Sequence, residues 1–215
     1  MKNVWVFNHY AITPDLPGGT RHFELGRQLS ENGYNVVIFA SNFIHMNFEF
    51  VKLKKNKRYK LEKFCNLDFI WVKTNSYKKN NWKRLQNMFS YCCRIIGLYR
   101  RLVKKGIIEK PDIIIGSTIH PFAALTAAFI ARKYKIPFIF EIRDLWPQTF
   151  IDMRIWRKSS FVSRFFRFIE KKTVFKSNKI IILSPKTKDY LLKRYNYLSE
   201  NIYYIPNGVD SEFYR

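Results

Sequence analysis

The stretch "DIIIGSTIHPFAALTAAFIARKYKIPFIFEIRDLWPQ", residues 112–148, carries the clearest evidence of the fold. An apolar run at 112–117 is followed by a turn-forming segment and by a helix pattern over 121–134. A second apolar run, 137–142, ends abruptly in charged residues. Two continuous apolar strands joined through a helix form the repeating unit of a parallel sheet. The polar residues between the two apolar pieces leave each too short to cross a membrane.

The same alternation extends outward on both sides of this segment and predicts an α/β fold, with a parallel sheet covered by helices on both faces. Residues 41–66 indicate a loop or a small hairpin. The expected strands are 3–7, 35–40, 67–73, 112–117, 137–142, 179–184 and 201–206. The expected helices are 21–32, 81–105, 121–134, 161–177 and 186–195.

Composition limits the class of protein. The chain has 215 residues, of which 47% are hydrophobic and 18% aromatic, so it can form a large core and is not a disordered tail. Its formal net charge is +23, and residues 51–110 alone hold eighteen basic and three acidic side chains. This asymmetry favours an anionic partner, which can be phospholipid, nucleic acid or a phosphorylated substrate. The three cysteines have no CxxC spacing, which argues against a disulfide framework or a zinc site.

The predicted helix 81–105 is both apolar and basic, and its role has two interpretations. Its apolar face either packs on the sheet or, together with the bases, meets an anionic membrane. Aromatic residues interleaved with bases in "FVSRFFRFIEKK", residues 161–172, also suit an interfacial surface. The expected inward stripe is Trp82, Leu85, Phe89, Cys92, Ile96, Tyr99 and Val103, widened by Met88, Ile95 and Leu102. The expected outward, membrane-facing bases are Lys83, Arg84, Arg94, Arg101 and Lys105.

Polar side chains recur where predicted strands end, which is where parallel sheets bind ligands. Histidines at such places more often pack than react, and Glu141 could simply pair with a nearby base. A glycine pair, Gly18–Gly19, precedes the first helix and is either an anion-binding loop or an ordinary turn. The polar residues at strand ends are His9, Ser117, His120, Arg143, Asp144 and Ser184.

Four stretches of the chain, in this order, resemble the amino-terminal half of glycosyltransferase family 4, which has the GT-B fold. The resemblance is greatest to the bacterial surface-polysaccharide subgroup. It implies a Rossmann-like amino-terminal domain over 1–205 and, at 206–215, the start of a hinge to a donor-binding domain. The stretches are "NHYAITPDLPGGTRHFELGRQLSENGYNVVIFAS", "STIHPFAALTAAFIARKYKIPFIFEIRDLWPQ", "IILSPKTKDYLLKR" and "IPNGVDSEFYR".

The resemblance also implies roles for individual residues. Gly18 and Gly19 would approach the donor phosphate or sugar, and Asp144 would be the catalytic residue on the acceptor side. Many relatives have histidine where this chain has Arg143, and a permanently charged guanidinium binds anions well but is a poor base. Arg143 is therefore assigned to acceptor binding, as are His9, His120 and Glu141.

The implied reaction is sugar transfer from a nucleotide-sugar donor with retention of configuration, without a metal or another cofactor. The implied acceptor is a polyprenyl-diphosphate-linked sugar, which places the protein in the cytoplasm, peripherally bound to the inner face of the plasma membrane. We expect little activity from the chain alone, because the family's donor contacts lie in a second domain. The alternatives are one subunit of a split glycosyltransferase and a non-enzymatic basic domain that binds nucleic acid. The main interpretation, an acceptor-side glycosyltransferase domain, expects no nucleic-acid partner.

Overall fold

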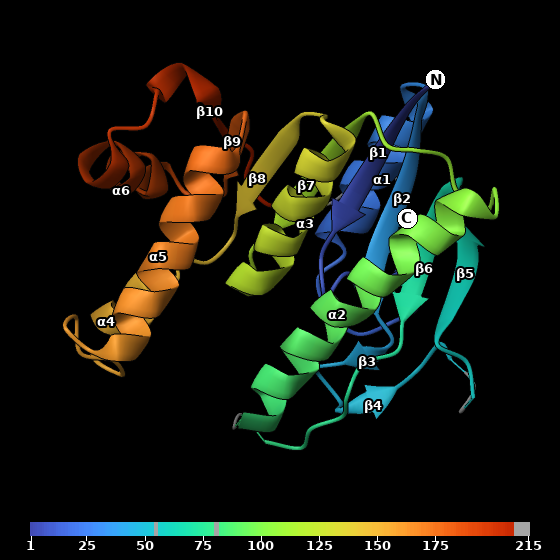
Figure 1. The fold of residues 1–215 in the computed structure, drawn as a ribbon, viewed down its shortest axis with the longest axis horizontal. Coiled ribbons are helices and arrows are strands. Elements are labelled where there is room, and N and C mark those ends of the chain that lie inside the picture. Colours follow the sequence, from blue (N-terminus) through green and yellow to red (C-terminus); the bar gives the residue numbers. More distant parts are fainter. Residues whose placement is uncertain (54–55, 80–81, 209–215) are drawn as a thin grey trace. The chain divides into compact units, whose positions relative to one another are not determined.

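The computed structural model describes residues 1–53, 56–79 and 82–208 (Figure 1). By its internal contacts the chain divides into two compact units, and Met1–Ile113 and Ile114–Asn207 form the bulk of them. Each unit combines a largely parallel set of strands with helices, as the apolar strand pattern predicts. The predicted α/β, Rossmann-like fold class is confirmed.

The first unit contains four neighbouring strands in the order β1-β2-β6-β5. The first three are parallel, whereas β5 runs antiparallel to β6, so this unit departs from a purely parallel sheet. Residues 41–66, for which the sequence indicates a loop or a small hairpin, contribute to two hairpins, β3–β4 and β5–β6. The bounds are β1 Lys2–Phe7, β2 Tyr34–Ser41, β3 Phe43–Ile44, β4 Glu49–Phe50, β5 Tyr59–Phe64 and β6 Leu67–Val72.

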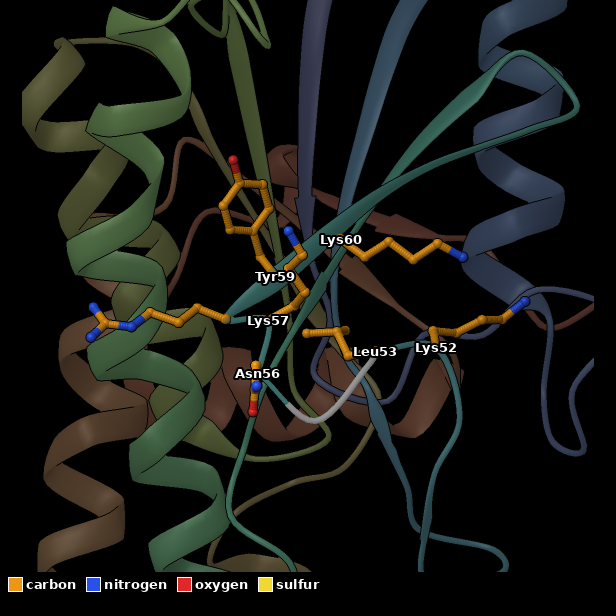
Figure 2. A pocket seen from close by; sticks show the side chains of 7 residues that line it. Lys52, Leu53, Asn56, Lys57, Tyr59 and Lys60 are labelled. Atoms are coloured by element: carbon orange, nitrogen blue, oxygen red, sulfur yellow. The ribbon is translucent and has the colours of Figure 1, made fainter.

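Two helices, α1 (Arg21–Glu31) and α2 (Trp82–Lys104), lie on opposite sides of these strands (Figure 2). An aromatic core joins the strands: the rings of Phe7 and Phe39 stack with centroids 4.6 Å apart, and Trp5 meets Phe39 edge-on at 5.3 Å. Trp5, Phe7 and Phe39 are fully buried. Burial of rings of this size supplies much of the stability of a core.

The buried face of α2 differs from the predicted one. Trp82 is 60% exposed, and Leu85, Phe89 and Ile96 are also exposed. Cys92 and Tyr99 of the predicted inward stripe are buried as expected, together with the widening residues Met88, Ile95 and Leu102. The buried face is therefore rotated toward the second stripe, because a helix with apolar residues on two adjacent stripes can bury either. The buried side chains are Asn87, Met88, Tyr91, Cys92, Ile95, Tyr99 and Leu102.

The second unit has strand order β10-β9-β8-β7, and its strand pairs β7–β8, β8–β9 and β9–β10 are parallel. The short elements α4 and η1 were not predicted. The strands are β7 Ile113–Ser117, β8 Phe138–Ile142, β9 Lys179–Ile182 and β10 Ile202–Tyr204. The helices are α3 Pro121–Tyr134, α4 Gln148–Asp152, α5 Phe161–Lys176, α6 Pro185–Tyr195 and the 3-10 turn η1 Ser199–Asn201.

Close packing holds α3 against β7 in this unit. A Cβ added at Gly116 would lie 2.7 Å from Cβ of Ala127 and 3.1 Å from Cα of Ala124. A larger residue at position 116 would push α3 away from β7, so glycine there allows the helix to pack directly on the strand. Among the helices in the described part of the chain, none is long and apolar enough to cross a membrane.

Candidate functional site

The carboxyl end of β1 leads into a buried polar cluster in the first unit. Asn8 Nδ2 is hydrogen-bonded to His22 Nδ1 of α1 at 2.6 Å. His9 is 1% exposed, and its ring stacks on that of Tyr91 with centroids 4.4 Å apart. The candidate His9 therefore lies at the strand end, as predicted, but as a packed side chain. Asn8 and His22 were missed, since nothing in the sequence shows that they would pair.

The glycine pair lies between β1 and α1. Gly18 has φ +140°, and a Cβ there would come within 2.8 Å of Ile12 Cδ1. Gly19 has no neighbouring atom within 4 Å of an added Cβ. The loop thus requires glycine at position 18 for its own conformation, whereas position 19 faces open space in which a ligand could approach the backbone.

A chain of aromatic hydroxyls and an imidazole joins three loops of the first unit. The hydroxyls of Tyr10 and Tyr77 lie 3.2 Å apart, and the Tyr77 hydroxyl lies 2.8 Å from His45 Nδ1. Burial and, to a lesser degree, the charge of Arg84 lower the pKa of His45. Burial raises the pKa of Tyr77 well above its usual range. These residues come from segments up to 67 positions apart, so sequence periodicity could not have predicted the cluster.

Beside this chain, the carboxyl ends of β2 and β6 are tied together by side-chain hydrogen bonds. The hydroxyls of Ser41 and Thr74 lie 2.7 Å apart, and Asn87 Nδ2 of α2 donates to Thr74 Oγ1 at 3.0 Å. Asn42 Oδ1 accepts from the Thr74 backbone N–H at 3.2 Å. All four side chains are buried, and these bonds tie the two strand ends to α2, although Asn87 Oδ1 is buried without a hydrogen-bond partner among the described residues.

A basic pocket of about 780 Å³ lies at the start of β5, which pairs with the end of β6. Figure 2 shows Lys52 and Lys60 extending from it in the same direction, toward α1. Both ammonium groups form salt bridges with Glu62, Lys52 at 3.4 Å and Lys60 at 2.9 Å. The Trp71 indole N–H also donates a hydrogen bond to Glu62, at 2.7 Å. The lining residues are Lys52, Leu53, Asn56, Lys57, Arg58, Tyr59 and Lys60.

The bases predicted to face a membrane do not all occupy one kind of position on α2. Arg94 and Arg101 line a pocket of about 230 Å³, together with Arg58. Lys83 is exposed near the start of the helix. Arg84 is half-buried, and its positive charge helps to lower the pKa of His45. The fifth base, Lys105, is exposed immediately after the last helical residue.

In the second unit, the loops after β7 and β8 are held together by Thr118. Its Oγ1 accepts a hydrogen bond from the Arg143 backbone N–H at 3.0 Å, and its carbonyl accepts from the Asp144 N–H at 3.3 Å. The Thr118 N–H donates in turn to the Glu141 carbonyl at 2.9 Å. Arg143 is half-buried and Asp144 is exposed. Thr118 was not among the predicted site residues, although its hydroxyl lies next to a strand end in "GSTIHP", which is the signal that could have found it.

His120, Glu141 and Ser117 of this unit are buried, whereas Ser184 is exposed. His120 caps α3, accepting from the Ala123 N–H through Nδ1 at 3.3 Å. Glu141 lies inside β8, is 1% exposed and is paired in register with Ser117 of β7. The Ser117 hydroxyl is buried and has no hydrogen-bond partner among the residues that the structure describes.

A cavity of about 490 Å³ begins next to Asp144, at Leu145, and extends to the carboxyl end of β9. Lys158, Lys186 and Arg194 give its wall a positive charge. A cavity of this size and charge can hold a phosphate-bearing ligand. The remaining lining residues are Gln148, Asp152, Ser184, Thr187 and Tyr190.

One wall of this cavity is supported by a buried carboxylate, Glu170 of α5. Tyr190 donates a hydrogen bond to Glu170 Oε2 at 2.7 Å, and Tyr195 donates to the same oxygen. Burial raises the pKa of Glu170 from its ordinary value of 4.5 to about 7, against the lowering effect of the tyrosine hydroxyls and of Arg194. The guanidinium of Arg194 also lies over the Tyr190 ring, 5.7 Å from its centroid.

In the second unit, the structure brings Glu141, Arg143 and Asp144 together around Thr118, in the loop that ends at His120. His9 and the glycine pair belong to the first unit. The site roles and the domain bounds stay predictions. Of the expected hinge, 206–208 is described, and 209–215 lies outside the described residues. Within the described ranges, no group of three or more His, Cys, Asp or Glu side chains is placed to hold a metal ion.

Residues 18–213 match the family described as Glycosyltransferase Family 4. The chain is similar in fold to UGT89C1 of Arabidopsis thaliana, solved with UDP-L-rhamnose, with a TM-score of 0.54 and 16% identity over 98% of this chain and 50% of that one. A glycosyltransferase from Rickettsia africae ESF-5 matches with a TM-score of 0.47 and 16% identity over 99% of this chain and 45% of that one. The chain therefore spans about half the length of these solved structures. No curated protein matches the sequence significantly.

Proposed function

Because this chain belongs to glycosyltransferase family 4, we propose that it is the amino-terminal, acceptor-side domain of a retaining glycosyltransferase. The enzyme transfers a sugar from a nucleotide-sugar donor to a polyprenyl-diphosphate-linked acceptor in cell-surface polysaccharide synthesis, in the bacterial subgroup that the sequence resembles. The observation that carries the acceptor assignment is the Arg143–Asp144 loop, which Thr118 holds beside the basic cavity of about 490 Å³.

The proposed chemistry divides between two neighbouring side chains. In the transfer, the bond from the donor's anomeric carbon to the diphosphate breaks, and a bond to an acceptor hydroxyl oxygen forms. We assign the exposed carboxylate of Asp144 to contact that hydroxyl and to take its proton, while the nucleoside diphosphate leaves with the electron pair of the broken bond. Arg143 binds the acceptor's phosphate or sugar, because a guanidinium stays charged and donates in a fixed fork.

The donor contacts are proposed to come from a second domain that these 215 residues do not contain. The fold match spans half of a longer protein that is solved with the nucleotide sugar UDP-L-rhamnose, which supports a donor of the same class here. Stabilising a departing diphosphate is usually a large part of the catalysis of such transfers. We therefore expect little turnover from this chain by itself, whether the second domain belongs to the same polypeptide or to a partner subunit.

A peripheral position on the cytoplasmic face of the plasma membrane fits the proposed acceptor. The basic excess of 51–110 would favour anionic lipid, with Arg58, Arg94 and Arg101 already gathered around one pocket. A nucleic-acid partner would use the same charge, but no observation in the described structure favours it over lipid.

A titration tests the acceptor assignment without needing turnover. The 215-residue chain is titrated with a short-chain polyprenyl diphosphate, and we expect Lys186→Ala, in the cavity wall, to weaken binding about tenfold. Lys193→Ala removes an exposed base from the same helix that does not line the cavity, and it should leave affinity unchanged. Equal affinities for both variants, or no binding by the wild-type chain, would remove the assignment.

A further inference from the structure

A line of phenylalanines on α5 faces outward. The rings of Phe161, Phe165, Phe168 and Phe175, here called the α5 aromatic stripe, are 83%, 42%, 54% and 57% exposed. Their spacings of four, three and seven residues place them along one side of the helix. Soluble proteins seldom leave so large an apolar surface uncovered without a partner. The opposite side of the helix is buried through Ser163, Phe166, Ile169, Glu170, Thr173 and Val174.

The helix that carries this stripe is anchored by aromatic packing beneath it. Phe166 stacks on Trp156 with ring centroids 5.4 Å apart, and Trp156 stacks on Phe150 at 4.4 Å. Trp146 also meets Phe166 at 5.0 Å. Figure 1 shows α4, which contains Phe150, at the amino-terminal end of α5. The stripe is therefore presented by a packed element, so its exposure belongs to the folded state.

Apolar side chains in the segment before α5 are exposed as well. Met153 is 63% and Ile155 is 57% exposed, and Val162 in the first turn of the helix is 43% exposed. These side chains are aliphatic, so they offer no ring on which a nucleic-acid base could stack. They add exposed apolar side chains, close in sequence to the stripe, of the kind that enters hydrocarbon.

The charge around the stripe is almost entirely positive. Residues 153–176 contain eight basic side chains and one acidic one, Glu170, which is buried. Lys172 Nζ lies over the Phe168 ring, 4.4 Å from its centroid, so a positive charge stands directly on the stripe. A second copy of this face would bring like charges together, which disfavours a symmetric dimer here. The basic residues are Arg154, Arg157, Lys158, Arg164, Arg167, Lys171, Lys172 and Lys176.

We propose that the α5 aromatic stripe lies in the plane of an anionic phospholipid bilayer, with its phenylalanines in the interface and its flanking bases on the lipid phosphates. The helical rise puts Phe161 and Phe175 about 21 Å apart, long enough for a line of contact along the surface. The many charges beside the rings suit a helix that lies on a membrane and not one that spans it. The inference rests on the proposed function for its membrane setting, and it adds a second surface, separate from the bases of α2.

Vesicle flotation of the 215-residue chain tests this assignment, and it needs neither donor nor acceptor. Vesicles of phosphatidylcholine containing roughly one-third phosphatidylglycerol provide the anionic surface. We expect the wild-type chain to float with them and the double variant Phe165→Ser/Phe168→Ser to bind about tenfold more weakly or worse. Restoring apolar side chains, in Phe165→Leu/Phe168→Leu, should return most of the binding.

A matched control distinguishes insertion of the α5 aromatic stripe from nonspecific adsorption of exposed apolar side chains to vesicles. Leu198→Ser removes an exposed apolar side chain, 60% accessible, from another surface element of the same unit, and it should float like the wild type. The double serine variant should remain folded at the temperature of the flotation assay, because both rings are partly exposed and neither belongs to the buried side of the helix. Undiminished flotation of that variant would overturn the proposal, since bases alone would then hold the chain on lipid. Two other results would also contradict the proposal. One is a wild-type dimer that is lost in the serine variant, and the other is loss of nucleic-acid binding in that variant while flotation is unchanged.

Because flotation involves no sugar transfer, this proposal and the proposed function can fail separately. A chain that floats through α5 but does not bind a polyprenyl diphosphate would keep the membrane surface and lose the acceptor assignment. A chain that binds the diphosphate but floats equally well without the two phenylalanines would do the reverse.

Discussion

The Thr118 hydroxyl oxygen accepts a hydrogen bond from the backbone N–H of Arg143 at 3.0 Å, across 25 positions of sequence. The two residues follow neighbouring parallel strands, β7 and β8, so the bond fixes one strand-end loop against the other. The same hydroxyl lies 3.3 Å from the carbonyl oxygens of Glu141 and Asp144. The position of the proposed catalytic loop therefore depends on a side chain that is not itself proposed to touch substrate.

Replacing this hydroxyl should loosen the loop. Thr118→Val keeps the shape of the side chain but leaves the Arg143 N–H without its acceptor, and we expect the free energy of unfolding to fall by about 1–2 kcal/mol. Thr173→Val is the matched control: Thr173 Oγ1 donates to the Ile169 carbonyl within α5, so its loss should cost less than about 0.5 kcal/mol. Urea denaturation of both variants measures the difference, and equal losses would argue against a role for Thr118 as a clamp.

The carboxyl of Glu170 should make stability depend on pH. Its pKa is raised from 4.5 to about 7 in the folded chain, mainly by burial, so the folded state binds the proton more tightly than the unfolded state. The stabilisation is complete below pH 4.5 and is lost as the pH rises through about 7. Relative to Glu170→Gln, we expect the wild-type free energy of unfolding to fall by about 3 kcal/mol over that window.

The measurement compares denaturation curves of the wild type and Glu170→Gln at a series of pH values. Glu200→Gln, at an exposed position, controls for the change in net charge and should show the wild-type pH dependence. A constant difference between the wild type and Glu170→Gln from acid to neutral pH would mean that Glu170 titrates normally.

The two adjacent glycines should respond differently to the same substitution. Gly18→Ala places a Cβ 2.8 Å from Ile12 Cδ1 in a backbone with φ +140°, and we expect a loss of about 2 kcal/mol. Gly19→Ala meets no atom within 4 Å and should change stability by less than about 0.5 kcal/mol. Thermal unfolding gives both values. If Gly19→Ala proves the more damaging to stability, the loop has another conformation.

Strands and helices were predictable from periodicity, because short, mainly apolar runs such as 113–117 and 138–142 are typical of buried parallel strands. The inward face of α2 was predicted only in part, because apolar side chains cover two adjacent stripes and only tertiary contacts select Tyr91 over Phe89. The direction of β5 also escaped prediction, since its side chains are mostly half-buried and carry little alternation.

The candidate site was predicted in part for the same physical reasons. Strand ends could be placed from sequence, so Arg143 and Asp144 were found at the end of β8. Contacts that join distant segments, such as Tyr77 with His45 or Tyr195 with Glu170, depend on the fold and leave no local pattern. Burial of Glu141 was equally hidden, because a charged residue one position before the end of a strand usually reaches solvent.

The central claim, that this chain is the acceptor half of a sugar-transferring enzyme, is tested most directly by turnover. The chain is joined after Arg215 to a donor-binding domain of the same family, and transfer from a panel of nucleotide sugars to a polyprenyl-diphosphate-linked sugar is measured. We predict transfer from at least one donor, about a hundredfold or more slower in Asp144→Ala, whose fold should be intact. Wild-type turnover in Asp144→Ala would contradict the account.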